Sequence, residues 1–180
     1  MKGIIFNEFF EMTDQKFGME LTEQLISQSE LSTDGAYTAV GTYPHQDLVS
    51  LVVNLSKIKN IPIDDLQKAF GVYLFARFNY HYEHFFENVT DALDFLESIE
   101  NYIHIEVKKL YPEAELPKMN PNRIDENTLE LTYHSEKAMA HFALGLIKGC
   151  LEHFDTEAEV KMSPVTYGQL TDVVFRIKRT

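Results

Sequence analysis

The hydrophobic periodicity of this chain changes near Tyr111-Pro112, and no other feature constrains its fold as strongly. Before this point apolar residues recur at the three- and four-residue spacing of amphipathic helices. After the segment from Pro117 to Pro121 they alternate along the chain, as in half-buried strands, with one more helical stretch among them. The periodicity therefore predicts an α+β fold, with a helical N-terminal part and a small C-terminal antiparallel sheet packed by a helix.

The chain has 180 residues and 44% apolar side chains, which is enough for one domain with a sizeable core. We expect a single domain over residues 1–180, with a helical subdomain over 1–60 and a second subdomain over 61–180. The helices that the periodicity predicts span 4–17, 21–29, 46–58, 62–79, 92–110 and 138–154, and the strands span 129–134, 157–162 and 172–178. Thr90-Asp91 is expected to cap the fifth helix, and Tyr167-Gly168 predicts a hairpin-like return between the last two strands.

Charge and composition exclude several classes of function. The formal net charge of −12 argues against a nucleic-acid partner, because a phosphate backbone is bound by clustered Lys and Arg. No apolar run is long enough to cross a bilayer, and acidic residues begin at Glu8, unlike a secretory signal, so we expect a cytoplasmic protein. Cys150 is the only cysteine, which excludes an intrachain disulfide, an iron–sulfur cluster and a thiolate zinc site within one chain.

His104 lies in the middle of the fifth predicted helix. At about 100° per residue it falls near one line with Leu93 and Tyr111, on the face predicted to be buried. A buried histidine is more often a satisfied core residue than a metal ligand. The position alone leaves both interpretations open, because a ligand role also requires a cofactor-sized pocket.

Tyr133, Ser135 and Lys137 follow at alternate positions, so their side chains can point to one side of an extended segment. Two hydroxyl groups and a cation suit a pair of half-buried carboxylates on a ligand. The alternative is an ordinary strand end followed by a helix whose N-cap is Ser135. Combined with His104, the pattern could hold a flat cofactor with a metal at its centre and acids on its rim.

Several short motifs occur in a characteristic order along the chain. They are Met1-Lys2-Gly3-Ile4-Ile5-Phe6, Lys68-Ala69-Phe70-Gly71, the helical stretch 103–111 around His104, Leu116-Pro117, Tyr133-x-Ser135-x-Lys137 and Leu144-Gly145-Leu146. Their order and spacing closely resemble the haem nitric oxide/oxygen binding (H-NOX) family, gas-sensing domains related to the sensor part of soluble guanylate cyclase. The resemblance covers essentially the whole chain and is to the stand-alone bacterial type, without an appended effector domain.

The resemblance implies a haem, expected to be haem b, buried between the helical part and the sheet part. His104 would be the proximal ligand of the iron, which makes it the metal-binding residue, and Tyr133 and Ser135 would hydrogen-bond the haem propionates. Lys137 stands where the family motif has Arg, which keeps the charge but loses the planar two-pronged donor. Pro117, together with Ile5, would press on the haem and distort it.

The same resemblance implies a distal gas pocket with apolar walls. The residues expected to line it are Ile5, Phe9, Leu74, Phe78, Phe142 and Leu146. Oxygen-binding members have a Tyr at the position of Phe142, supported by a Trp and an Asn at the positions of Phe9 and Leu74. O2 gains from a hydrogen-bond donor in a dry pocket, whereas NO depends mainly on the iron, so the apolar side chains favour NO, and CO as a weaker ligand, over O2.

The function expected on this basis is a non-enzymatic sensor that binds NO and CO at ferrous haem, excludes O2 and signals to a separate effector protein. In this family the effector is a histidine kinase or a cyclic-di-GMP enzyme. Three alternatives stay open: an O2-binding haem protein, an interaction domain without its cofactor, and a non-haem metal-dependent enzyme. The last would use His81, His84 and Glu87, which lie at helical spacing, although such a stretch is more often a solvated helix end.

Overall fold

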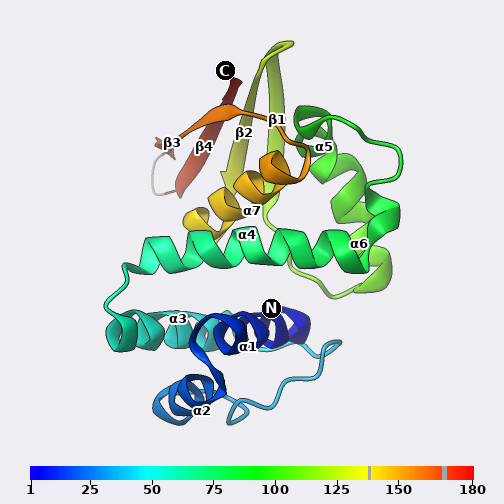
Figure 1. Cartoon of the computed structure of the whole chain (residues 1–180). Coiled ribbons are helices and arrows are strands. Elements are labelled where there is room, and N and C mark those ends of the chain that lie inside the picture. The colour runs from blue at the N-terminus through cyan, green and yellow to red at the C-terminus, as the bar shows by residue number, and fades with distance from the viewer. Residues whose placement is uncertain (138, 168–169) are drawn as a thin grey trace.

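A computed structural model describes residues 1–137, 139–167 and 170–180 of the chain (Figure 1). The helical elements are α1 (Gly3–Phe17), α2 (Met19–Gln28), α3 (His45–Lys59), α4 (Ile63–His81), the 3₁₀ helix η1 (Glu83–Phe85), α5 (Ala92–Ser98), the π-helical turn η2 (Ile99–Ile103), α6 (His104–Leu110) and α7 (Ala140–His153). The strands are β1 (Lys118–Asp125), β2 (Thr128–His134), β3 (Ala158–Tyr167) and β4 (Leu170–Arg179). The predicted α+β class is confirmed.

Local signals in the sequence account for the ends of the N-terminal helices. Gly18 ends α1 with a φ of 91°, and its N–H donates to the carbonyl of Asp14. Asn60 ends α3 in the left-handed conformation, which asparagine tolerates better than most residues. Pro62 precedes α4, and two acidic residues follow in its first turn, where they interact favourably with the helix dipole. These helices therefore begin and end within a few residues of the predicted positions.

The four strands form one antiparallel sheet in the order β1-β2-β4-β3. One face of the sheet is apolar, since Leu129, Leu131 and Tyr133 of β2 are buried with Phe175 and Ile177 of β4. Helix α7 joins β2 to β3 and packs in the same hydrophobic cluster as this face, together with α5. This is the arrangement expected for an alternating strand pattern that needs one covered face.

Helix α4 crosses the middle of the molecule, between α1–α3 on one side and α7 with the sheet on the other (Figure 1). Its backbone approaches that of α7 very closely, because a Cβ atom at Gly145 would lie only 2.2 Å from the carbonyl oxygen of Lys68 and 2.8 Å from the Cα of Gly71. Glycine is needed there for close approach rather than for an unusual φ. The contact fixes the spacing of two helices that carry cavity-lining side chains.

Two hydrophobic clusters make up the core, and α4 contributes to both. Leu66, Phe70 and Leu74 pack with side chains of α1–α3, whereas Phe75 packs with α5, α7 and the sheet. The clusters therefore meet within α4 rather than at residue 60. The predicted division into subdomains over 1–60 and 61–180 stays a prediction.

Strand β1 was not predicted, because its sequence lacks the alternation of apolar residues that marks the other strands. Only Met119 among its eight residues is buried, and Pro121 lies within it. The sheet order places β1 at an edge, where a proline without an N–H removes no necessary ladder bond. Edge position thus explains both the tolerance of the proline and the missed strand.

The predicted helix over 92–110 is interrupted. Asp91 caps its start as predicted, accepting hydrogen bonds from the N–H groups of Leu93 and Asp94, but η2 separates α5 from α6. A π-helical turn adds a residue, so the regular 100° spacing does not continue across it. Leu93 accordingly packs in the sheet-side core, while His104 lines the cavity described below.

Two sequence predictions involve residues outside the described part. They are the helix start at Ala138 and the hairpin return at Gly168. Across the described ranges, no helix is both long and apolar enough to span a membrane.

A buried carboxylate fixes the loop between α2 and α3. Asp47 is 5% exposed and accepts hydrogen bonds from the N–H (3.1 Å) and hydroxyl (2.6 Å) of Ser32 and from the hydroxyl of Tyr37 (2.8 Å). Burial alone would raise the pKa of Asp47, but these hydrogen bonds outweigh it and hold the pKa below its ordinary value. The ionised form is therefore favoured by folding.

We expect Asp47→Asn to lower the free energy of unfolding by about 1–3 kcal/mol at neutral pH, measured by urea denaturation, because buried donors lose a charged acceptor. A carboxyl whose pKa is lowered by folding stabilises above its unfolded pKa, and this contribution is lost as the pH falls through the folded value. The difference between Asp47→Asn and the parent should therefore shrink in acid. The exposed Glu23→Gln is the control, and equal effects of the two variants would contradict the account.

Candidate functional site

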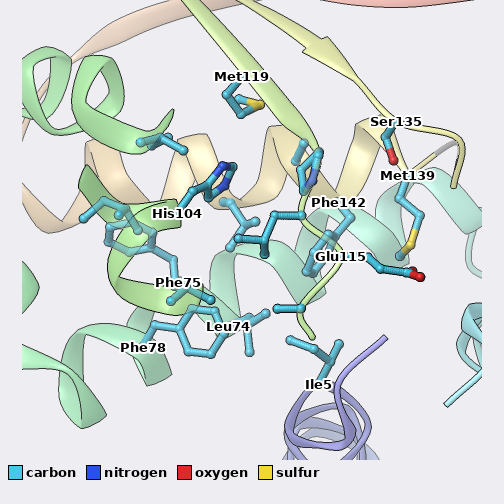
Figure 2. Close-up of a pocket in the computed structure, with 18 of the residues that line it drawn as sticks. Ile5, Leu74, Phe75, Phe78, His104, Glu115, Met119, Ser135, Met139 and Phe142 are labelled. Carbon is cyan, nitrogen blue, oxygen red and sulfur yellow. The ribbon is translucent and has the colours of Figure 1, made fainter. Parts of the chain in front are cut away.

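A cavity of about 710 Å³ lies between the central helices and one end of the sheet. Its lining comes mainly from the helical elements α1, α4, α5, η2, α6 and α7, from β1 and β2, and from the segment between α6 and β1. Figure 2 shows His104 on one side of the cavity and Ser135 and Glu115 toward another. The volume is within the range of sites that bury a small ligand or cofactor.

His104 is the first residue of α6, and its side chain is 15% exposed. Its Nδ1 lies 3.1 Å from Oε2 of Glu100, which leaves Nε2 as the ring nitrogen available to a ligand in the cavity. Burial lowers the pKa of His104, and the nearby carboxylate of Glu100 opposes that shift only in part. The ring is therefore neutral at pH 7, as a metal-ligating imidazole must be.

A second group of polar side chains lies where β2 ends. Tyr133, Ser135 and Lys137 all line the cavity, as their alternate spacing predicts. Only Tyr133 is in the strand; the other two lie in the turn that follows, where the Ser135 hydroxyl accepts from the N–H of Lys137 at 3.2 Å. Burial raises the pKa of Tyr133, which keeps its hydroxyl a neutral donor.

The alternative interpretation of Ser135 as a helix cap is wrong. Helix α7 begins at Ala140, its N-cap residue is Met139, and no side chain caps it. Ser135 lines the cavity instead, and its hydroxyl accepts from the backbone N–H of Lys137.

The charge of Lys137 is shared with a carboxylate on the neighbouring loop. Its Nζ lies 2.8 Å from Oε2 of Glu115, and both residues line the cavity. The hydrogen bond from Lys137 lowers the pKa of Glu115, which is 70% exposed and thus ionised at neutral pH. A ligand carboxylate at this rim would meet two hydroxyls and a cation already in contact with one anion.

Most of the remaining lining is apolar. The predicted side chains that line the cavity here are Ile5, Leu74, Phe78, Phe142 and Leu146, with Pro117 on the loop before β1. The side chains on helices come from α1, α4 and α7, and the glycine contact fixes the spacing of α4 and α7. None of these side chains carries a hydrogen-bond donor.

Phe9 is the predicted pocket residue that the structure does not bring to the cavity. Its ring is fully buried and packs edge-on against Phe70 at a centroid distance of 5.1 Å, within the N-terminal core. Phe9 therefore belongs to the N-terminal core rather than to the lining of the cavity. Spacing along α1 could not reveal this, because Ile5 and Phe9 are one turn apart on similar faces.

Two tyrosines that the sequence did not assign to the site also line the cavity. The hydroxyl oxygens of Tyr82, just after α4, and Tyr111, just after α6, are 2.9 Å apart. Tyr73 and Tyr80, the other tyrosines of this region, do not line it, and Tyr80 is 70% exposed. Periodicity predicts that Tyr111 shares the buried face of His104, whereas Tyr82 follows the end of α4, where periodicity carries no information on direction.

His81, His84 and Glu87 do not form a metal site. All three residues are exposed, and α4 ends at His81. The Nε2 of His81 lies 3.0 Å from a guanidinium nitrogen of Arg77. Within the described ranges, no group of three His, Cys, Asp or Glu residues could hold a metal ion. The stretch is the exposed helix end that was the commoner expectation.

The donor set of the cavity fits a haem. A neutral imidazole nitrogen suits the iron, hydroxyl and ammonium groups at the rim suit the propionates, and apolar walls suit the porphyrin. The residues that would hold it are His104, Tyr133, Ser135 and Lys137, all of which line the same cavity.

A family model described as Haem-NO-binding matches residues 2–162. Three solved H-NOX structures, described next, each match this chain over 100% of its length. The unliganded Fe(II) A71G mutant from K. algicida is 39% identical with a TM-score of 0.93, over 97% of that chain. The Fe(II)NO protein from S. oneidensis is 30% identical with a TM-score of 0.88, over 99% of that chain. The Fe(II)CO protein from Shewanella woodyi, bound to IWP-051, is 38% identical with a TM-score of 0.85, over 95% of that chain. A search of curated proteins found no match.

Proposed function

Because this chain belongs to the haem-NO-binding (H-NOX) family of haem-based gas sensors, we propose that it senses NO and excludes O2 without catalysing a reaction. The cofactor in this proposal is haem b, whose ferrous iron supplies the gas-binding position. The observation that carries the proposal is the apolar wall formed by Leu74, Phe78 and Phe142 in a cavity that also holds His104.

Each cavity residue has a role in haem binding that follows from the chemistry of its side chain. His104 binds the iron through Nε2, since its Nδ1 is held by Glu100. Tyr133 and Ser135 donate to the propionates, and Lys137 contributes a positive charge. Pro117 and Ile5, which both line the cavity, would press on the porphyrin.

Selectivity follows from what the apolar wall lacks. O2 is stabilised by a hydrogen-bond donor in a site of low dielectric constant, and NO depends much less on one. The side chains of Leu74, Phe78, Phe142 and Leu146 offer no donor. Relatives solved with NO and with CO support a site of this kind.

Signalling requires a partner protein in this proposal. By family resemblance the partner is a histidine kinase or a cyclic-di-GMP enzyme. The cytoplasmic location expected from the sequence stays a prediction.

The test is the absorption spectrum of the protein purified with haem. A Soret band that shifts on anaerobic addition of NO or CO, and does not convert to an oxy spectrum in air, is the expected result. A stable oxy spectrum would contradict O2 exclusion. If an oxy spectrum does form, Tyr82→Phe tests whether the hydroxyl of Tyr82, which also lines the cavity, is the hydrogen-bond donor that stabilises bound O2.

Phe142→Tyr is expected to raise O2 affinity by about tenfold, because one hydrogen bond contributes up to about 1.5 kcal/mol. NO binding should change little. Phe10→Tyr in α1 is the matched control, since Phe10 does not line the cavity. The O2 affinity of each protein is measured by optical titration, and an equal gain in both variants, or none in Phe142→Tyr, would argue against the assigned wall.

Lys137 and Glu115 should affect haem retention in opposite directions. Lys137→Ala removes the cation, whereas Glu115→Gln removes the anion that competes with the propionates for it. Because Glu115 is well exposed, we expect changes in the rate of haem loss of about two- to fivefold. The rate is followed by transfer of haem to an excess of a colourless haem acceptor protein.

Glu113→Gln is the matched control for this experiment, because Glu113 is on the same loop, lies 3.7 Å from Lys2 and does not line the cavity. Faster haem loss in Glu115→Gln, or the same change in Glu113→Gln, would count against the proposed role of the Lys137 rim.

A further inference from the structure

Glu100 occupies an unusual place beside the proposed iron ligand. It lies in the π-helical turn η2, one residue after that turn begins, and four residues before His104. π-helical turns are rare and occur frequently at functional sites. Here the turn brings the carboxylate of Glu100 to 3.1 Å from Nδ1 of His104.

The carboxylate is held from a second side. The same oxygen of Glu100, Oε2, accepts from the backbone N–H of Met119 at 3.0 Å. Met119 is in β1, pairs with Tyr133 of β2 and also lines the cavity. Glu100 is therefore anchored to the sheet and does not simply follow the motion of the His104 ring.

A carboxylate at Nδ1 has two consequences for an imidazole. It accepts the Nδ1 proton, which assigns the tautomer whose Nε2 carries the free electron pair. It also withdraws that proton partially, which makes Nε2 more basic and a stronger metal ligand.

We propose that Glu100 is a positioning residue that orients His104 and strengthens its bond to the iron. The inference rests on the proposed function, in which His104 ligates haem. A neutral amide at position 100 keeps the shape and the bond from Met119, but it withdraws the Nδ1 proton less.

The test is resonance Raman spectroscopy of the ferrous protein, comparing Glu100→Gln with the parent. We expect the iron–histidine stretching band to move to lower frequency and haem affinity to fall about 10- to 100-fold, the usual effect of removing such an outer partner. Glu106→Gln is the matched control, because Glu106 lies two residues after His104 in the sequence but pairs with Lys109. Its band should stay at the parent frequency.

An unchanged stretching frequency in a haem-loaded Glu100→Gln would overturn the proposal, even if that variant is less stable. If Glu100→Gln does not retain haem, ¹⁵N-histidine NMR of the parent CO complex decides. A proton on Nδ1 of His104 that exchanges slowly supports the proposal, and a rapidly exchanging one overturns it. A parent protein that binds no haem would refute the proposed function instead, so the two failures are distinguishable.

Discussion

Backbone contact between α4 and α7 is the constraint on which the rest of the structure depends. At Gly71 and Gly145 the two helices approach more closely than any side chain would allow. The same helices carry Leu74, Phe78 and Phe142, so the contact also fixes the shape of the apolar wall. Since α4 belongs to both hydrophobic clusters, it connects the N-terminal helices to the cavity and the sheet.

Two environments meet within one cavity. The wall formed by Leu74, Phe78 and Phe142 offers no hydrogen-bond donor, while the end of β2 and the turn after it present hydroxyls and a cation. His104 lines the same cavity. Burial lowers its pKa and keeps the ring neutral, and the carboxylate of Glu100 lies at one of its two ring nitrogens. A flat ligand with an apolar body, charged edges and a central metal needs this division.

Periodicity predicted most of the fold, because the spacing of apolar residues indicates the buried faces of amphipathic helices and half-buried strands. It failed where the physical cause was not local. Strand β1 is recognisable only from its place at the sheet edge, which tolerates Pro121. The π-helical turn before His104 has no pattern of its own, and it removed the predicted alignment with Leu93.

The candidate site was predicted largely through resemblance, and the structure brings its residues to one cavity with the exception of Phe9. Phe9 is on the expected helix, but its ring packs against Phe70, because packing between α1 and α4 determines its direction. Tyr82 and Glu100 were missed because each lies at an irregularity, one after a helix end and the other in a π-helical turn. Their roles depend on three-dimensional neighbours that spacing does not encode.

The central claim is that the neutral ring of His104 holds the haem in this cavity. The most direct measurement is the absorption spectrum of His104→Gly, purified with haem, before and after imidazole is added. The account predicts that the Soret band of the parent is lost and that imidazole, filling the space of the missing side chain, restores it. A His104→Gly protein with the unaltered spectrum of the parent in the absence of imidazole would contradict the account.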